Sequence, residues 1–313
     1  MVSLLLRNSA RGPKVAVYSK TLSADFYKLE ITTGEHFEKV VSSIAAKGIK
    51  KETIVEVKDD FFTRLEYSGP WGEECVEGHI VRLRMNSLPD KAGFDEPIQS
   101  IGFSEEEGVG ESAAFIFQKQ STVLLLERNR NAVTTFTFAT FFKQLGEVPG
   151  EINLHPILQH DVYQKVFDAK VLRKLIVQLA GPDNIGAAVA EMEPSVHEML
   201  KARQSLKAPI AEFTYSVGQQ RKAGLDLQRV LGTVKDFLTL HQGEETQVEK
   251  LIVHGSSGPH GDFAVDLLES RLNGKDVVET TIERRIPYER RRDALRRIWL
   301  RSKDEINKLY VAK

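Results

Sequence analysis

Ala113-Ala-Phe-Ile-Phe-Gln118, Lys119-Gln-Ser121 and Thr122-Val-Leu-Leu-Leu-Glu127 form one continuous stretch of this 313-residue chain. Two short runs rich in aromatic and aliphatic residues, joined by a polar triplet, are typical of a β-hairpin. We therefore predict a pair of antiparallel strands here.

A helix is predicted directly after this hairpin, from Ala132 to Leu145. Its phenylalanines recur at the spacing of a buried helix face. We therefore expect this aromatic cluster to lie in the core rather than to stack on nucleic-acid bases. The cluster comprises Phe136, Phe138, Phe141 and Phe142.

The N-terminal third is predicted to consist mostly of strands. A helix is expected from Phe37 to Gly48, with Thr33 as its N-cap, and a turn is expected at Gly69-Pro70. The strand-like segments are Lys14–Ser19, Phe26–Thr32, Thr53–Lys58, Phe61–Tyr67 and His79–Met85.

The glycine- and proline-containing segment 146–150 is the predicted domain boundary. It divides the chain into an N-terminal α+β domain over 1–148 and a C-terminal α+β domain over 149–313. In the second domain Asn273-Gly274 predicts a hairpin between Phe263–Leu272 and Val277–Ile282. The expected fold class is α+β, with mixed, largely antiparallel sheets, a few helices and a long basic C-terminal helix.

Composition narrows the classes of protein to consider. The hydrophobic fraction of 41% and the charged fraction of 28% are those of a folded domain. No apolar run approaches the roughly 18 residues that a bilayer crossing needs, and Cys75 is the single cysteine. We therefore expect a cytoplasmic protein with no disulfide, no metal site and no membrane partner.

The charge distribution gives the strongest functional indication. From Arg284 to Lys303 the chain has eight arginines and one lysine against two acids, so this segment carries +9 − 2 = +7. The whole chain is −1, so the remaining residues sum to −8. Such asymmetry indicates a surface that meets a polyanion.

Helical phase divides the segment from Tyr288 to Leu309 into two faces. Leu295, Ile298 and Trp299 share an arc that can pack on the protein, whereas the arginines fall on other sides. We predict phosphate contacts from Arg284, Arg285, Arg290, Arg292, Arg296, Arg297, Arg301 and Lys303. The alternative is that these arginines pair with the surplus acids of the chain.

Two further features carry weaker indications. Arg128 and Arg130 lie between a strand and a helix, where backbone N–H groups attract anions, although an Asn131 N-cap with two surface arginines is the favoured explanation. Glu56-Val-Lys58 and Asp168-Ala-Lys170 have the acid-x-Lys spacing of metal-dependent nucleases, without an evident partner acid. We expect no cofactor and no catalytic activity.

A family resemblance adds to these patterns. The hairpin with its phenylalanine-rich helix, the segment Lys165–Gly181 and the terminal helix over 294–309 resemble the A component of the Rex phage-exclusion system of lambdoid phages and related prophage proteins. The resemblance implies a cytoplasmic homodimer that binds duplex DNA with little sequence preference and acts in phage exclusion. The alternatives are a metal-dependent nuclease and an interaction module that binds an acidic protein.

Overall fold

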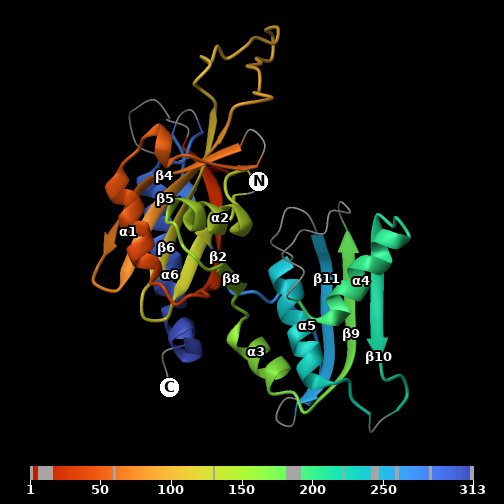
Figure 1. Ribbon diagram of the computed structural model, residues 1–313. Helices are drawn as coiled ribbons and strands as arrows, with labels where there is room; N and C mark the ends of the chain where they lie inside the picture. Colours follow the sequence, from red (N-terminus) through yellow and green to blue (C-terminus); the bar gives the residue numbers. More distant parts are fainter. Residues whose placement is uncertain are drawn as a thin grey trace. The chain divides into compact units, whose positions relative to one another are not determined.

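The computed structural model describes residues 3–5, 17–58, 61–129, 131–180, 192–220, 223–240, 247–257, 261–281 and 284–310. The chain folds into two compact units (Figure 1). One comprises 1–25, 29–153 and 274–302, and the other 26–28, 154–273 and 303–313. The predicted boundary at 148/149 lies close to the change of unit at 153/154, but 274–302 belongs to the N-terminal unit instead of the C-terminal one.

A nine-stranded sheet runs through the described part of the first unit. Its strand order is β1-β2-β7-β6-β5-β4-β3, and β8 and β13 also pair with β2. The strands are β1 (Ser3–Leu5), β2 (Val17–Ile31), β3 (Val55–Lys58), β4 (Phe61–Trp71), β5 (Cys75–Arg84), β6 (Val109–Gln118), β7 (Val123–Glu127), β8 (Ile152–Pro156) and β13 (Asn273–Glu279). The predicted α+β class and the hairpin, which is β6–β7, are confirmed.

Alternation along the strands gives this sheet two different faces. Phe115 and Phe117 of β6 point toward α1 (Phe37–Lys47) and α2 (Thr135–Leu145), where Phe37 and Phe142 meet edge to face at 4.9 Å. Glu77 and Glu127 point to the opposite face and meet α6 (Tyr288–Tyr310). The predicted core role of the aromatic cluster is confirmed for Phe138, Phe141 and Phe142, whereas Phe136 is exposed.

Three local predictions for this unit were wrong. β4 continues through Gly69 and Pro70, because both pair with β5, and the chain turns at Gly72 with φ of 64°. The N-cap of α1 is His36 rather than Thr33. The N-cap of α2 is Thr134, which forms a capping box with Thr137, rather than Asn131.

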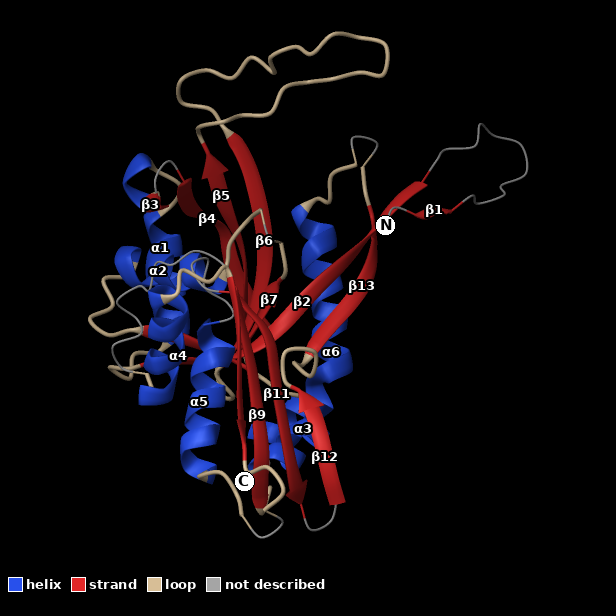
Figure 2. Cartoon of the chain, turned by 90° about the vertical axis from the view of Figure 1, so that its right-hand side faces the viewer, coloured by secondary structure: helices blue, strands red, loops and turns tan. Residues whose placement is uncertain are grey.

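The second unit is a four-stranded antiparallel sheet with helices packed on one face (Figures 1 and 2). Its strand order is β10-β9-β11-β12. The elements are α3 (His160–Phe167), β9 (Val171–Ala180), α4 (Pro194–Ser205), β10 (Ile210–Ser216), α5 (Leu227–Leu240), β11 (Gln247–Ser257) and β12 (Gly261–Asp266). α4 has Pro194 as its first residue, the helix position that tolerates proline best.

The hairpin predicted at Asn273-Gly274 does not form. β12 pairs with β11, whereas β13, which starts at Asn273, pairs with β2. Gly274 instead lies beneath α6, where an added Cβ would stand 2.2 Å from Ile298 Cγ2. The glycine therefore permits close packing of helix on strand rather than a turn. None of the helices in the described ranges combines the length and apolar character that a bilayer crossing requires.

Candidate nucleic-acid interface

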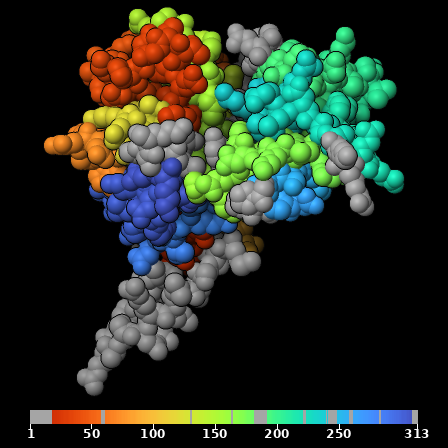
Figure 3. Space-filling model, turned by 90° about the horizontal axis from the view of Figure 1, so that it is seen from below, coloured from red at the N-terminus to blue at the C-terminus, as the bar shows by residue number. Residues whose placement is uncertain are grey.

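α6 is held on the first unit by the apolar arc that helical phase predicted. Leu295, Ile298 and Trp299 are each at most 2% exposed. Their burial fixes which arginines face the sheet and which face outward. Part of α6, in dark blue, forms the surface of the molecule in Figure 3.

Arg296 belongs to the inner side of the helix. Its Nε and Nη2 donate to the two carboxylate oxygens of Glu77 at 2.8 and 2.6 Å, and Glu77 is 2% exposed. Its guanidinium also lies over the Trp71 ring, 5.3 Å from the centroid. A buried carboxylate requires such a partner, so Arg296, predicted to bind phosphate, is instead engaged in packing α6 on β5.

Arg291 makes a second inward ion pair, with Glu127 at the end of β7. Arg291 also donates to the backbone carbonyl of Ser112 at 3.2 Å. Burial raises the pKa of Glu127, and the charge of Arg291 opposes that rise. These two ion pairs fasten the arginine-rich helix to two neighbouring parts of the sheet.

An aromatic stack lies at the start of α6. The rings of His79 and Tyr288 are stacked at 4.6 Å, with Tyr67 5.3 Å from Tyr288. Burial lowers the pKa of His79 to about 4, helped by the charge of Arg291. Burial also raises the pKa of Tyr288, and the Glu77 carboxylate adds to that rise. Both rings are therefore neutral at neutral pH.

Three arginines on α6 form an outward stripe, which we call the basic stripe: Arg290, Arg297 and Arg301. Arg297 and Arg301 share one carboxylate, Asp276 of β13, at 2.7 and 3.5 Å. Their side chains remain 51% and 54% exposed. Arg290 donates to the backbone carbonyls of Glu279 and Thr280 at 2.9 and 3.2 Å. Three cations therefore meet one anion, a surplus of +3 − 1 = +2.

Arg284 and Arg285, just before α6, are both exposed. Arg284 lies in a turn with φ of 61°, with its guanidinium 5.0 Å from the centre of the Tyr18 ring. Both side chains are accessible to a ligand. That they contact phosphate stays a prediction.

The other predicted residues are arranged differently. Arg292 bonds its neighbour Asp293 at 3.2 Å, and Lys303 is exposed where α6 passes into the second unit. Arg128 pairs with Asp25, which is 7% exposed, through Nε at 2.8 Å. Arg128 is thus a structural partner of a buried acid, and Arg130 lies outside the described residues.

The two acid-x-Lys triplets belong to different units. Glu56 lies on β3 of the first unit, and Asp168 is the C-cap of α3 in the second. No group of three His, Cys, Asp or Glu residues in the described ranges is arranged to hold a metal ion. The nuclease alternative stays a prediction.

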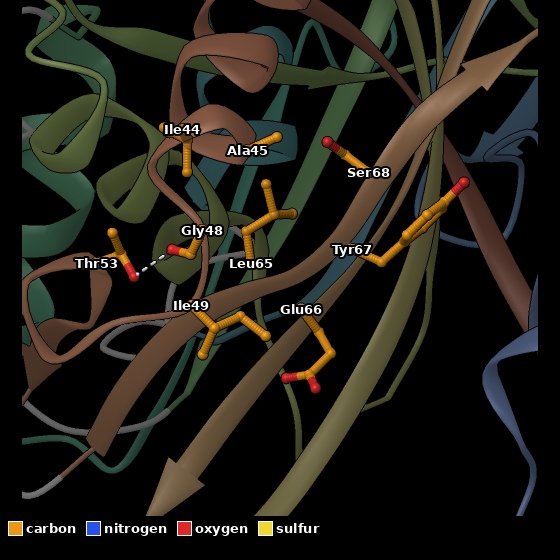
Figure 4. A pocket seen from close by; sticks show the side chains of 9 residues that line it. All are labelled: Ile44, Ala45, Gly48, Ile49, Thr53, Leu65, Glu66, Tyr67 and Ser68. Atoms are coloured by element: carbon orange, nitrogen blue, oxygen red, sulfur yellow. Dashed lines mark hydrogen bonds between the residues drawn. The ribbon is translucent and has the colours of Figure 1, made fainter.

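A cavity of about 190 Å³ lies between the end of α1 and β4 (Figure 4). Its lining is mainly apolar, with Ile44, Ile49 and Leu65, and Glu66 is its charged member. Thr53 donates to the carbonyl of Gly48 at 2.9 Å and closes one side. Its polar side chains are those of Thr53, Glu66, Tyr67 and Ser68.

Sequence reasoning missed the acids that decide which arginines are occupied. Glu77 lies within a buried strand, and Glu127 follows the apolar run Val123-Leu-Leu-Leu126. A carboxylate in such a position needs a cationic partner, so these two residues were a usable signal. The sequence around Asp276 did not indicate a partner for the arginines. Exposed and less exposed residues alternate along β13, as they do in an ordinary edge strand.

Comparison with protein families identifies one match, a family of unknown function, DUF6731, over residues 73–308. No curated protein matches the sequence. The matched region includes β5, β6, α6 and the basic stripe. Since the match spans well over half of the sequence, the chain belongs to the DUF6731 family.

Proposed function

We propose that the protein binds the phosphate backbone of duplex DNA, with little preference for base sequence, through the basic stripe together with Arg284 and Arg285. The observation that supports the proposal best is the sharing of Asp276 by Arg297 and Arg301. One carboxylate cannot neutralise two guanidinium groups. The stripe therefore retains charge and free N–H donors that a phosphate can take up.

The chemistry of these arginines suits phosphate binding. They project from a helix whose other face is buried in the protein, and a guanidinium group can donate paired hydrogen bonds to phosphate oxygens. Contacts made to phosphates alone position a protein without reading sequence. Affinity would then come mainly from counterion release.

Removing the stripe provides the first test. The triple variant Arg290→Gln, Arg297→Gln, Arg301→Gln is expected to bind a fluorescent duplex much more weakly than the parent, as measured by anisotropy. The matched control is Lys143→Gln, Lys165→Gln, Lys250→Gln, which removes the same charge from other exposed ion pairs. Equal loss in both variants would mean that net charge, not this surface, governs binding.

Asp276 allows a test with the opposite sign. Asp276→Asn removes the anion that competes with phosphate for Arg297 and Arg301, so DNA affinity should rise. If the two arginines serve only to fasten β13 to α6, the substitution will lower the melting temperature and leave DNA affinity unchanged. That result would assign both arginines a structural role.

The biological part of the proposal rests on the resemblance to the Rex component. We propose that the DNA-binding form is a cytoplasmic homodimer that acts in phage exclusion. The plating efficiency of phage on cells that express the parent or the triple variant tests this role. Equal protection by both, at equal protein levels, would separate phage exclusion from DNA binding.

A further inference from the structure

A second cavity, of about 340 Å³, lies within the second unit. It is formed by α4, α5, the strands β9 and β10 and the residues just before the two helices. This volume is at the lower end of the range of small-molecule sites. It lies in the other unit from the basic stripe, so its chemistry can be considered independently.

The inner wall of this cavity is apolar and is part of the packed core of the second unit. Leu175, Met199 and Val230 line it and belong to the hydrophobic core of the unit. Beside them the hydroxyls of Ser195 and Thr233 are 2.6 Å apart, and Thr233 donates to the carbonyl of Arg229 at 2.7 Å. The hydroxyl pair ties α4 to α5 and fixes the width of the cavity.

Carboxylates dominate its charged groups. Glu193, Glu198 and Asp226 line the cavity, against the single cation Arg229. Arg229 is 82% exposed and lies 3.9 Å from Asp226. Within the described residues, the side chains of Glu193 and Glu198 have no hydrogen-bonding partner. The lining therefore carries a net negative charge, with Glu198 and Asp226 exposed.

Gly232 leaves room for the Glu193 carboxylate beside α5. A Cβ at this position of α5 would stand 2.6 Å from Glu193 Oε1 and 2.9 Å from its Cγ. Glycine within a helix lowers helix stability by roughly 1 kcal/mol relative to alanine. α5 has this glycine at the position where the Glu193 side chain packs against the helix backbone.

Like charges crowd around the site. Burial raises the pKa of Asp236, and the neighbouring Glu193 carboxylate adds to the rise, although the backbone N–H of Glu193 donates to Asp236 at 2.7 Å. Burial likewise raises the pKa of the Tyr215 hydroxyl, with Glu198 contributing. A bound cation would relieve this repulsion.

We propose that this cavity binds a small aliphatic amine, with ammonium groups paired to Glu193 and Glu198 and a methylene chain over Leu175, Met199 and Val230. The apolar wall matches the chain, and the aromatic ring of Tyr215 at the edge offers a face to an ammonium group. Three carboxylates against one guanidinium disfavour an anionic ligand.

Calorimetric titration of the full chain with 1,4-diaminobutane tests the proposal, with 1,4-butanediol as the neutral probe of similar length. At about 0.15 M ionic strength, saturable binding of the diamine and not of the diol is expected. Glu198→Gln should weaken diamine binding by about two- to fivefold, because Glu198 is exposed and an exposed ion pair contributes up to about 1 kcal/mol. Glu212→Gln, an exposed acid on β10 outside the lining, should leave it unchanged.

Gly232→Ala distinguishes ligand binding by Glu193 from a purely structural role of this residue. Alanine favours the helix but displaces the Glu193 carboxylate, so diamine binding should weaken while the protein remains folded in a thermal melt. Equal binding of the diol, equal weakening by Glu212→Gln, or binding of a lysine-containing peptide without binding of the free diamine would overturn the proposal.

Discussion

At the scale of residues, adjacent arginines on α6 have opposite roles. Arg296 closes a bidentate pair with buried Glu77, whereas Arg297 is half exposed and shares Asp276. Identical side chains next to each other in sequence thus differ because successive residues of a helix are rotated by about 100° about its axis. Counting charges cannot separate them.

Stability measurements should separate this pair. Arg296→Gln leaves Glu77 buried without its cation, so the free energy of unfolding should fall by about 3–5 kcal/mol. Arg297→Gln, at an exposed position, should change it by less than about 0.5 kcal/mol. Urea unfolding of both variants checks the contrast. Equal, small effects would mean that Glu77 tolerates the loss of Arg296.

His79 predicts a specific sensitivity to acid. Its pKa is lowered from 6.5 to about 4 in the folded protein, so between these values the unfolded chain binds a proton that the folded chain does not. Stability should therefore be complete above pH 6.5 and should fall with pH, by about 1.4 kcal/mol per unit for this one group. His79→Phe keeps a ring on Tyr288 and should make the decline from pH 6.5 to 4 shallower. Parallel stability profiles for parent and variant would contradict the assignment.

At the scale of elements, the contact of α6 with β13 decides where the basic stripe lies. Gly274 lets Ile298 approach the strand closely. Gly274→Ala should destabilise the protein by roughly 1–3 kcal/mol through overpacking, and the loss should be much smaller in an Ile298→Ala background. Thermal unfolding of the four proteins of this cycle measures the coupling. Additive effects would place the strain elsewhere.

Local patterns predicted many elements, and they failed where a distant partner decides the outcome. The hairpin β6–β7 and the buried arc of α6 follow from alternation and helical spacing. Asn273-Gly274 has the composition of a turn, but Ile298 of α6 packs against Gly274, and β13, which begins at Asn273, pairs with β2. The partners of Arg296 and Arg128 lie 219 and 103 residues away in the chain. No local pattern connects positions so far apart.

At the scale of the whole molecule, a chain of net charge −1 keeps a positive surface. Part of the +7 of this segment is neutralised by Glu77 and Glu127, which lie outside the segment. What remains is concentrated on the basic stripe and on Arg284 and Arg285. Attraction to a polyanion would therefore depend on these five arginine side chains.

The salt dependence of DNA binding tests this central claim most directly. If the stripe contacts phosphates, the logarithm of the association constant should fall linearly with the logarithm of salt concentration, by about 0.9 per contact. The triple variant of Arg290, Arg297 and Arg301 should then have a slope shallower by about 2 to 3. A duplex affinity that stays constant from roughly 50 to 200 mM salt, or slopes that are identical in parent and variant, would contradict the account.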